Sequence, residues 1–371
     1  MLENLKEKLN SGNLNKKLIM YIGIGFVALI VFLIILFVIK TISGNRISPE
    51  KLEGKIKAAA VSYYEKNPDK LPKENGSKLK ITIEELVEYD QLKSLDELLD
   101  KGTSCTGYVN VSKNNGYYSY IPYVDCGDDY KTNLLVNVIK NEKNVVTTGN
   151  GLYKMNDYYL FRGENLNNHV SFAGKNWLIL RVNNDNTIRL LLEDKSESVV
   201  WDDRYNTEKN SNVGKNNYDV SRIKESLSNY FKSDAFNDEE RSLIVPMNLC
   251  TGKRKYDAKV NNGSIECSKT VQNQPLGLLQ LNEYMLASIE ANCTDLYSYQ
   301  CTNYNYLSTL SSSFWTITAA AENSYKVYKI SGFPATANAS SSAQLKVVAT
   351  ISSDVIFTKG DGTVENPYVI K

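Results

Sequence analysis

The stretch Gly107-Tyr-Val-Asn-Val-Ser-Lys-Asn-Asn-Gly-Tyr-Tyr-Ser-Tyr-Ile-Pro-Tyr-Val124 has the pattern of a β-hairpin. Aromatic and β-branched residues, which favour strands, fill 107–111 and 117–124. Between them, Asn114-Asn115-Gly116 is a strong turn signal, because asparagine and glycine tolerate the positive φ angles of tight hairpin turns. The nearby Cys105 and Cys126 are expected to join the two strands covalently. This hairpin predicts a sheet in the first half of the chain.

The segment before the hairpin predicts helices. Ser48 can cap a helix over 49–66 that has proline at its first position. Its apolar face consists of Leu52, Ile56, Ala59, Ala60 and Tyr63. Thr82-Ile-Glu-Glu85 and Ser94-Leu-Asp-Glu97 both have the pattern of a capping box at the start of a helix. Residues 48–131 are therefore predicted to form a small α+β domain, with a polar linker over 132–151.

The rest of the chain, 152–371, is predicted to be a β-rich domain. Short runs with strand character recur along it, separated by turn signals. The predicted strands are 158–162, 169–173, 177–182, 187–192, 314–317, 325–330, 345–351 and 354–357. The predicted helices are 219–231, a short helix capped by Asn237 with Glu240 as its partner, and 281–288.

An apolar run without charge or proline extends from Leu18 to Ile39, between Lys16-Lys17 and Lys40. As a helix, about 22 residues at ~1.5 Å each would span roughly 33 Å, enough to cross the hydrocarbon core of a bilayer. The sequence therefore predicts that residues 18–40 cross the lipid bilayer after a cytoplasmic tail at 1–17. The predicted fold class is α+β: a single transmembrane helix, a small α+β domain and a larger β-rich α+β domain.

The cysteines suggest which side the bulk of the chain occupies, because the lysines and arginines flanking the apolar run do not decide it. All 6 lie after the run, in three close pairs: Cys105/Cys126, Cys250/Cys267 and Cys293/Cys301. Paired cysteines without a catalytic motif favour disulfides of an exported domain, whereas reduced thiols are the alternative. The predicted location is the cell membrane, with the domains extracellular.

Composition and motifs exclude several classes of function. The formal net charge of +1 argues against nucleic acid as a partner, since phosphate binding needs a basic surface. Phosphate-loop, dinucleotide-binding and nucleophile-elbow motifs are absent. The chain contains 1 His, His169, and no Cys-x-x-Cys pair. The sequence therefore predicts no cofactor, no metal and no catalytic residue.

Four neighbouring residues are candidate ligand-binding residues: Trp201, Asp202, Asp203 and Arg204. A tryptophan beside charged groups at a strand end can stack on a ligand while the charges bind its polar groups. The alternative is that aromatic residues on strands pack in the core. Trp201 is the tryptophan expected to be exposed, while Trp177 and Trp315 are expected to be buried.

The second domain also resembles a known family. The resemblance rests on Tyr159-Leu-Phe-Arg-Gly-Glu164, Asn167-Asn-His-Val170, Phe172, Trp177-Leu-Ile-Leu-Arg181, Ile188-Arg-Leu-Leu191, Ser226-Leu-Ser-Asn-Tyr-Phe231, Leu278-Leu-Gln-Leu-Asn-Glu-Tyr284, Phe314-Trp315 and Gly360-Asp-Gly-Thr-Val-Glu-Asn-Pro-Tyr368. These motifs are similar to those of surface-anchored bacterial proteins that carry a C-type-lectin-like domain of uncharacterised function. The sequence departs from that pattern at Leu178, where the family often has arginine, and at Leu345-Lys346, where it often has Arg-Pro.

The first domain resembles a pseudopilin, in which a membrane helix continues into an amphipathic one such as Ala58-Ala-Ala-Val-Ser-Tyr-Tyr64. The prepilin cleavage signature and the glutamate within the apolar run are absent. Three functions follow as hypotheses. The first is a cell-surface protein that binds an extracellular glycan or protein, the second is a pilin-like structural subunit of a filament or secretion apparatus, and the third is an extracellular enzyme.

Overall fold

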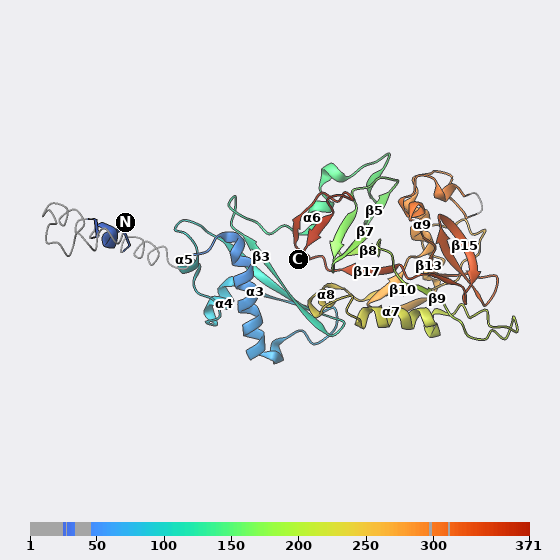
Figure 1. Ribbon diagram of the computed structural model, residues 1–371, viewed down its shortest axis with the longest axis horizontal. Helices are drawn as coiled ribbons and strands as arrows, with labels where there is room; N and C mark the ends of the chain where they lie inside the picture. Colours follow the sequence, from blue (N-terminus) through green and yellow to red (C-terminus); the bar gives the residue numbers. More distant parts are fainter. Residues whose placement is uncertain (1–24, 27, 34–45, 297–298, 311) are drawn as a thin grey trace, which may run out of the picture.

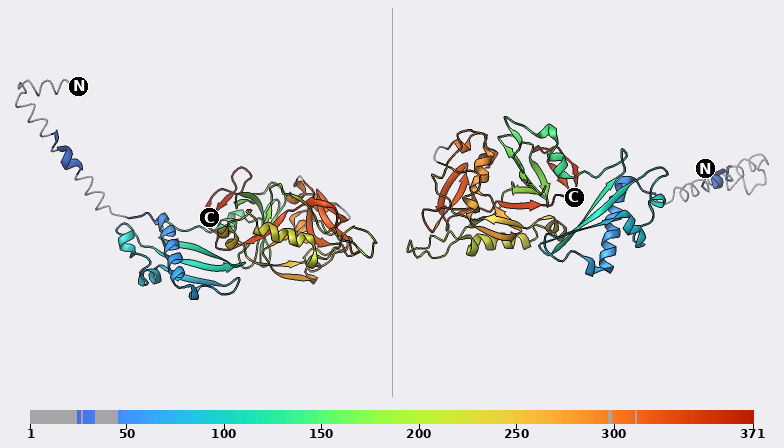
Figure 2. Two further views of the ribbon diagram at one scale, coloured as in Figure 1. Left: turned by 60° about the horizontal axis from the view of Figure 1, so that its bottom comes forward. Right: turned by 180° about the vertical axis from the view of Figure 1, so that it is seen from behind.

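The computed structural model describes residues 25–26, 28–33, 46–296, 299–310 and 312–371. Over these residues the protein is α+β and consists mainly of strands. Two domains lie side by side along the long axis of the molecule, and the C-terminus lies at the junction between them (Figures 1 and 2). The α+β part of the predicted fold class is therefore confirmed.

The first domain is a helix packed on a three-stranded antiparallel sheet (Figure 1). The helix is α3 (Pro49–Lys66), and the strands follow the order β1 (Lys78–Thr82), β2 (Thr106–Asn114) and β3 (Tyr117–Asp125). Leu52, Ile56 and Ala60 of α3 are fully buried in one core with Val109 and Val111 of β2. Because the apolar positions of α3 recur at helical spacing, one face of the helix covers the sheet. The helix has the predicted bounds.

The hairpin forms as predicted. Asn115 and Gly116 both have positive φ, 52° and 89°, as a two-residue hairpin turn of type I′ requires. The bond between Cys105 and Cys126 lies at the open end of the hairpin. The two other predicted disulfides, Cys250–Cys267 and Cys293–Cys301, are also present, so all three pairings are confirmed.

Of the two capping boxes predicted for the first domain, one is wrong. Thr82 caps α4 (Ile83–Glu88) by accepting from the Glu85 amide while the Glu85 carboxylate accepts from the Thr82 amide. Ser94 precedes α5 (Leu95–Leu98), but its side chain makes no capping hydrogen bond to the backbone of that helix. The Ser94 hydroxyl instead donates to the Glu97 carboxylate at 3.3 Å.

The second domain contains three sheets (Figure 1). The large sheet follows the order β12-β17-β8-β7-β6-β19-β18, with β5 paired to β7 and β4 to β5. Its strands are β4 (Gly151–Lys154), β5 (Tyr159–Arg162), β6 (His169–Phe172), β7 (Lys175–Val182), β8 (Ile188–Leu192), β12 (Leu276–Leu278), β17 (Val347–Ile351), β18 (Phe357–Lys359) and β19 (Tyr368–Ile370). The second sheet follows the order β15 (Phe333–Asn338), β14 (Lys326–Ser331), β13 (Phe314–Ala319), β16 (Ser342–Gln344) and β9 (Ser198–Val200). The third pairs β10 (Met247–Cys250) with β11 (Thr270–Gln274).

The helices of the second domain are α7 (Arg222–Lys232), α8 (Asp238–Leu243) and α9 (Leu281–Ala287). Trp177, Trp201 and Trp315 are all fully buried in the core of this domain. The core also holds an ion pair, in which Arg189 Nη2 donates to Glu283 Oε2 at 3.1 Å. Burial raises the pKa of the Glu283 carboxyl, but Arg189 and Arg181 outweigh it and hold the pKa below its ordinary value. Glu283 is therefore a structural carboxylate.

The segment predicted as a linker, 132–151, is folded onto the second domain. It contains a helix, α6 (Leu135–Ile139), where the sequence predicted a polar linker. Leu135, Val136 and Ile139 are buried in the core of the second domain. The Leu135 amide also donates to the Val355 carbonyl at 3.0 Å. The connection between the domains is therefore fixed by packing and hydrogen bonds.

The predicted transmembrane helix needs a correction. In the part of the chain that the structure describes, no helix is both long and apolar enough to cross a membrane. This finding overturns the single N-terminal transmembrane helix of the predicted fold class. Residues 25–26 and 28–33 are helical. The remainder of the predicted span 18–40, and the whole predicted tail 1–17, lie outside the described residues.

Candidate functional site

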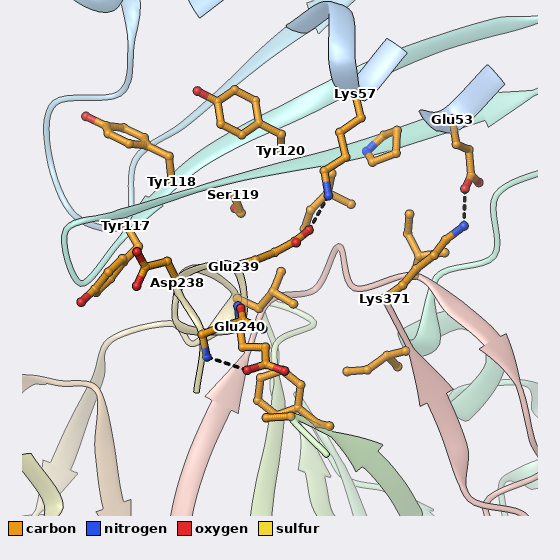
Figure 3. Close-up of a pocket in the computed structure, with 18 of the residues that line it drawn as sticks. Glu53, Lys57, Tyr117, Tyr118, Ser119, Tyr120, Asp238, Glu239, Glu240 and Lys371 are labelled. Carbon is orange, nitrogen blue, oxygen red and sulfur yellow. Dashed lines mark hydrogen bonds and ion pairs between the residues drawn. The ribbon is translucent and has the colours of Figure 1, made fainter. Parts of the chain in front are cut away.

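A cleft of about 870 Å³ lies between the two domains. The first domain contributes the N-terminal part of α3 and residues 116–122 along β3 (Figure 3). The second domain contributes the start of α8, the end of β6 with the turn after it, and residues 369–371 at the end of β19. The cleft is therefore formed by segments that are far apart in the sequence and meet only when the domains dock.

Strand β3 forms one wall of the cleft and is the edge strand of its sheet. Asn114 pairs with Tyr117 across the two-residue turn, so every second residue of β3 bonds to β2, beginning with Tyr117. The N–H and C=O groups of the residues between them point away from β2. Val124 confirms this alternation, because its N–H donates to Thr132 Oγ1 at 2.8 Å and its carbonyl accepts from the Thr132 amide at 2.9 Å.

The open part of this edge runs from Tyr118 to Pro122. The outward backbone groups of Tyr118 and Tyr120 have no hydrogen-bond partner in the described part of the chain. Pro122 has no N–H to offer, so only its carbonyl points outward. Since exposed strand edges can pair with another chain, proteins usually cover or interrupt them. Here the edge of β3 is left open and borders the cleft.

Ser119 adds an unpaired side-chain group to the same wall. Its hydroxyl oxygen is buried and has no hydrogen-bond partner among the described residues. The residue is only 4% exposed, and it lies between the two tyrosines whose backbone groups are open. An unpaired buried hydroxyl costs free energy, and this one adjoins the residues that line the cleft.

The opposite wall begins with the capped start of α8. Asn237 Oδ1 accepts from the Glu240 amide at 2.9 Å, and the Glu240 carboxylate accepts from the Asn237 amide at 2.7 Å. This capping box, which was predicted, places Asp238 and Glu239 in the first helical turn, at the cleft (Figure 3). Lys57 of α3 forms an ion pair with Glu239 across the cleft. The first turn of α8 therefore presents carboxylates to the cleft.

Glu53 forms a second, more buried link between the domains at one end of the cleft (Figure 3). Its carboxylate accepts hydrogen bonds from Tyr130 at 2.5 Å, from Thr132 at 2.6 Å and from Lys371 Nζ at 2.7 Å. Burial raises the pKa of the Glu53 carboxyl, but these hydrogen bonds outweigh burial and hold the pKa below its ordinary value. Glu53 is therefore ionised and holds the end of the chain against α3.

The lining of the cleft is net acidic. Over the described residues, its charged side chains are four carboxylates and two lysines: Glu53, Asp238, Glu239, Glu240, Lys57 and Lys371. Tyr117, Tyr118 and Tyr120 add aromatic surface (Figure 3). Acidic and aromatic groups together favour a positively charged ligand, through ion pairs and cation–π contacts.

The four residues predicted to bind a ligand lie elsewhere. Trp201 is fully buried, and its indole N–H donates to the Thr316 carbonyl at 3.2 Å, so the expectation that it is exposed is wrong. Asp202 is also buried and forms an ion pair with Arg204. Asp203 is exposed and lies 3.4 Å from Arg222. None of the four residues lines the cleft or the second pocket, which lies beside His169.

A second, smaller pocket of about 400 Å³ lies in the second domain beside His169. His169 Nδ1 is 2.9 Å from a carboxylate oxygen of Glu193, and Glu365 lines the same pocket. Among the described residues, no group of three or more histidine, cysteine, aspartate or glutamate side chains could hold a metal ion. The imidazole and carboxylates of this pocket can bind polar groups of a small ligand.

Sequence reasoning missed the residues of the cleft. Tyr118, Ser119 and Tyr120 belong to a predicted strand, but a strand pattern does not reveal which strand lies at the edge of its sheet. Comparison of the chain with models of protein families, with curated proteins and with solved structures finds no significant match. The functional assignment therefore rests on the geometry of the cleft.

Proposed function

We propose that this protein binds a segment of a protein partner in the cleft between its two domains, outside the cytoplasm. The observation that carries the proposal is the cleft wall of β3, where backbone groups of Tyr118 and Tyr120 and the buried hydroxyl of Ser119 have no partner among the described residues. A volume of about 870 Å³ lies within the range of ligand pockets, roughly 300–1,000 Å³. A peptide segment can satisfy backbone and side-chain groups at once.

The location is supported by the three disulfides, Cys105–Cys126, Cys250–Cys267 and Cys293–Cys301. Disulfides persist in oxidising compartments and are rare where thiols are kept reduced. No cysteine in the described residues is left free. Cysteines that are all paired in disulfides are typical of exported proteins, which bind their partners outside the cell.

The test is to select peptides from a random display library on the full-length protein and to measure their affinity for two variants. Gly54 is an exposed helical residue that lines the cleft, and a Cβ added there has open space around it. Gly54→Trp should therefore fill the cleft without disturbing α3 and weaken the selected peptides by about tenfold or more, a loss on the order of 1.4 kcal/mol.

Lys51→Trp is the matched control, because Lys51 is exposed on the same helix but does not line the cleft. The selected peptides should bind this variant as they bind the unchanged protein. If Gly54→Trp and the unchanged protein bound all selected peptides equally well, the cleft would not be the binding site.

A further inference from the structure

We infer that the partner binds as an extended strand that pairs with the open edge of β3, and that this strand carries lysine or arginine. The inference rests on the proposed function and specifies its chemistry. The open backbone groups of β3 support the strand pairing, and the acidic lining of the cleft supports the basic side chains.

The open edge offers a defined set of hydrogen-bonding groups. The N–H and C=O of Tyr118, the N–H and C=O of Tyr120 and the C=O of Pro122 point outward from the sheet. From Tyr118 to Pro122 the edge spans roughly 14 Å at ~3.4 Å per residue. In peptide recognition by strand addition, such groups supply affinity while alternate side chains supply specificity.

The edge is closed beyond Pro122 and ends at the hairpin turn before Tyr117, which limits where an added strand can lie. Beyond Pro122, Thr132 occupies the outward groups of Val124, and the Tyr130 carbonyl accepts from the Cys126 amide at 2.8 Å. The missing N–H of Pro122 also ends the ladder there. An added strand is therefore limited to about five residues opposite 118–122.

The hairpin tip is held in place before any partner binds. The Asn114 side-chain amide donates to the Ser242 carbonyl at 2.8 Å, and that of Asn115 donates to the Ile244 carbonyl at 2.7 Å. These bonds tie the end of β2 and the hairpin turn to α8 and the residue that follows it. Because the edge and the acidic wall are already fixed relative to each other, binding a strand between them orders little of the protein.

The charge of the cleft specifies the side chains of the added strand. Lys57 already places an ammonium group on Glu239, and a lysine of the partner can take the same position. The side chains of Lys57 and Glu239 are 38% and 67% exposed, so their ion pair contributes little to stability. A lysine of the partner can therefore readily replace Lys57 beside Glu239. The neighbouring rings also accept cations: the Arg241 guanidinium carbon lies 5.6 Å from the centre of the Tyr117 ring.

The test uses the full-length protein and a synthetic heptapeptide in which lysine alternates with valine and threonine, acetylated and amidated at its ends. A second peptide has the same side chains but carries N-methyl groups on alternate amides, which removes its hydrogen-bond donors along one edge. A third has glutamate in place of each lysine. Calorimetric titration should show that both altered peptides bind at least roughly tenfold more weakly than the first.

The protein side is tested with Tyr118→Pro and Tyr118→Ala. Both variants remove the same ring, and only proline removes the outward N–H, leaving the bonds from β3 to β2 intact. Tyr118→Pro should bind the lysine peptide about two- to tenfold more weakly than Tyr118→Ala, as expected for one lost hydrogen bond. Hydrogen exchange should show the Tyr118 and Tyr120 amides becoming protected when the peptide is added to the unchanged protein.

The outcomes separate this inference from the proposed function. If library-selected peptides bind in the cleft while the N-methylated and lysine peptides bind alike and Tyr118→Pro matches Tyr118→Ala, strand pairing is refuted and the cleft function stands. If the glutamate peptide binds as tightly as the lysine peptide, the basic partner is refuted. A dimer of the protein that Tyr118→Pro abolishes would make a second copy of this chain the occupant of the edge, and would overturn the inference.

Discussion

The residues around Trp201 show why a charged neighbourhood in the sequence did not indicate a binding site. Strand β9 ends at Val200 and the chain bends at Trp201, so that Trp201 and Asp202 are buried while Asp203 faces solvent. Asp202 accepts hydrogen bonds from the amides of Arg204 at 3.0 Å and Lys215 at 3.3 Å. The Asp202 carboxylate therefore stabilises the local backbone by accepting these hydrogen bonds. The sequence correctly indicated burial for Trp177 and Trp315, because both lie within apolar strands.

Trp201→Ala should lower the free energy of unfolding by roughly 3–5 kcal/mol, because it removes a fully buried aromatic side chain and leaves a cavity. Chemical denaturation followed by circular dichroism measures this change. Val220→Ala serves as the control, since Val220 is exposed, and its effect should stay within about 0.5 kcal/mol. Equal stability of the two variants would contradict the buried position of Trp201.

Among the elements, the hairpin and the capped helices follow from local sequence, whereas the edge of the sheet does not. Asn114-Asn115-Gly116 predicts the turn because only a few residue types tolerate its φ angles. Nothing in that stretch indicates that β1 pairs with β2 and leaves β3 at the edge. Sheet order depends on contacts between segments distant in sequence, which local patterns do not encode. The capping box of α8 was predicted for the same local reason, but its position opposite β3 was not.

Replacing both Cys105 and Cys126 by serine should destabilise the first domain by roughly 3 kcal/mol, since the bond closes a loop with a sequence separation of 21. Hydrogen exchange should show faster opening of the β2 and β3 amides, with the strands of the large sheet unchanged. The same replacement at Cys293 and Cys301, which lie in the second domain, is the matched control. If that control loosened β2 and β3 equally, the two domains would not unfold separately.

At the scale of the whole molecule, Glu53 joins the two domains through side chains that no local pattern brings together. It lies on α3, whereas Lys371 lies 318 residues later. The sequence favoured burial on one face of α3, and Glu53 adjoins Leu52 on that face. A buried carboxylate requires partners, but its partners are known only once the domains are docked. The cleft could not be predicted for the same reason.

The Glu53 carboxyl should make the domain junction sensitive to acid. Because its pKa in the folded protein lies below the ordinary value, its contribution to stability is complete above that ordinary value and is lost as the pH falls through the lowered pKa. Glu53→Gln should be less stable at neutral pH by roughly 1–3 kcal/mol. The difference from the unchanged protein should shrink as the solution becomes more acidic than the ordinary glutamate pKa, about 4.3.

Thermal unfolding over a series of pH values measures this dependence. Glu65→Gln is the control, because Glu65 is exposed on the same helix. Its stability should follow that of the unchanged protein at every pH. If the stability difference between Glu53→Gln and the unchanged protein stayed constant into the acid range, the partners of Glu53 would not stabilise its ionised form.

The uneven placement of aromatic residues has a spectroscopic consequence. Tryptophan occurs only in the second domain, at positions 177, 201 and 315, whereas the first domain contains tyrosines such as Tyr64, Tyr108 and Tyr120. Light absorbed by those tyrosines can pass by resonance energy transfer to the tryptophans while the domains remain docked. The native protein thus contains an intrinsic fluorescence donor and acceptor. Tryptophan emission excited through tyrosine can report separation of the domains without a label.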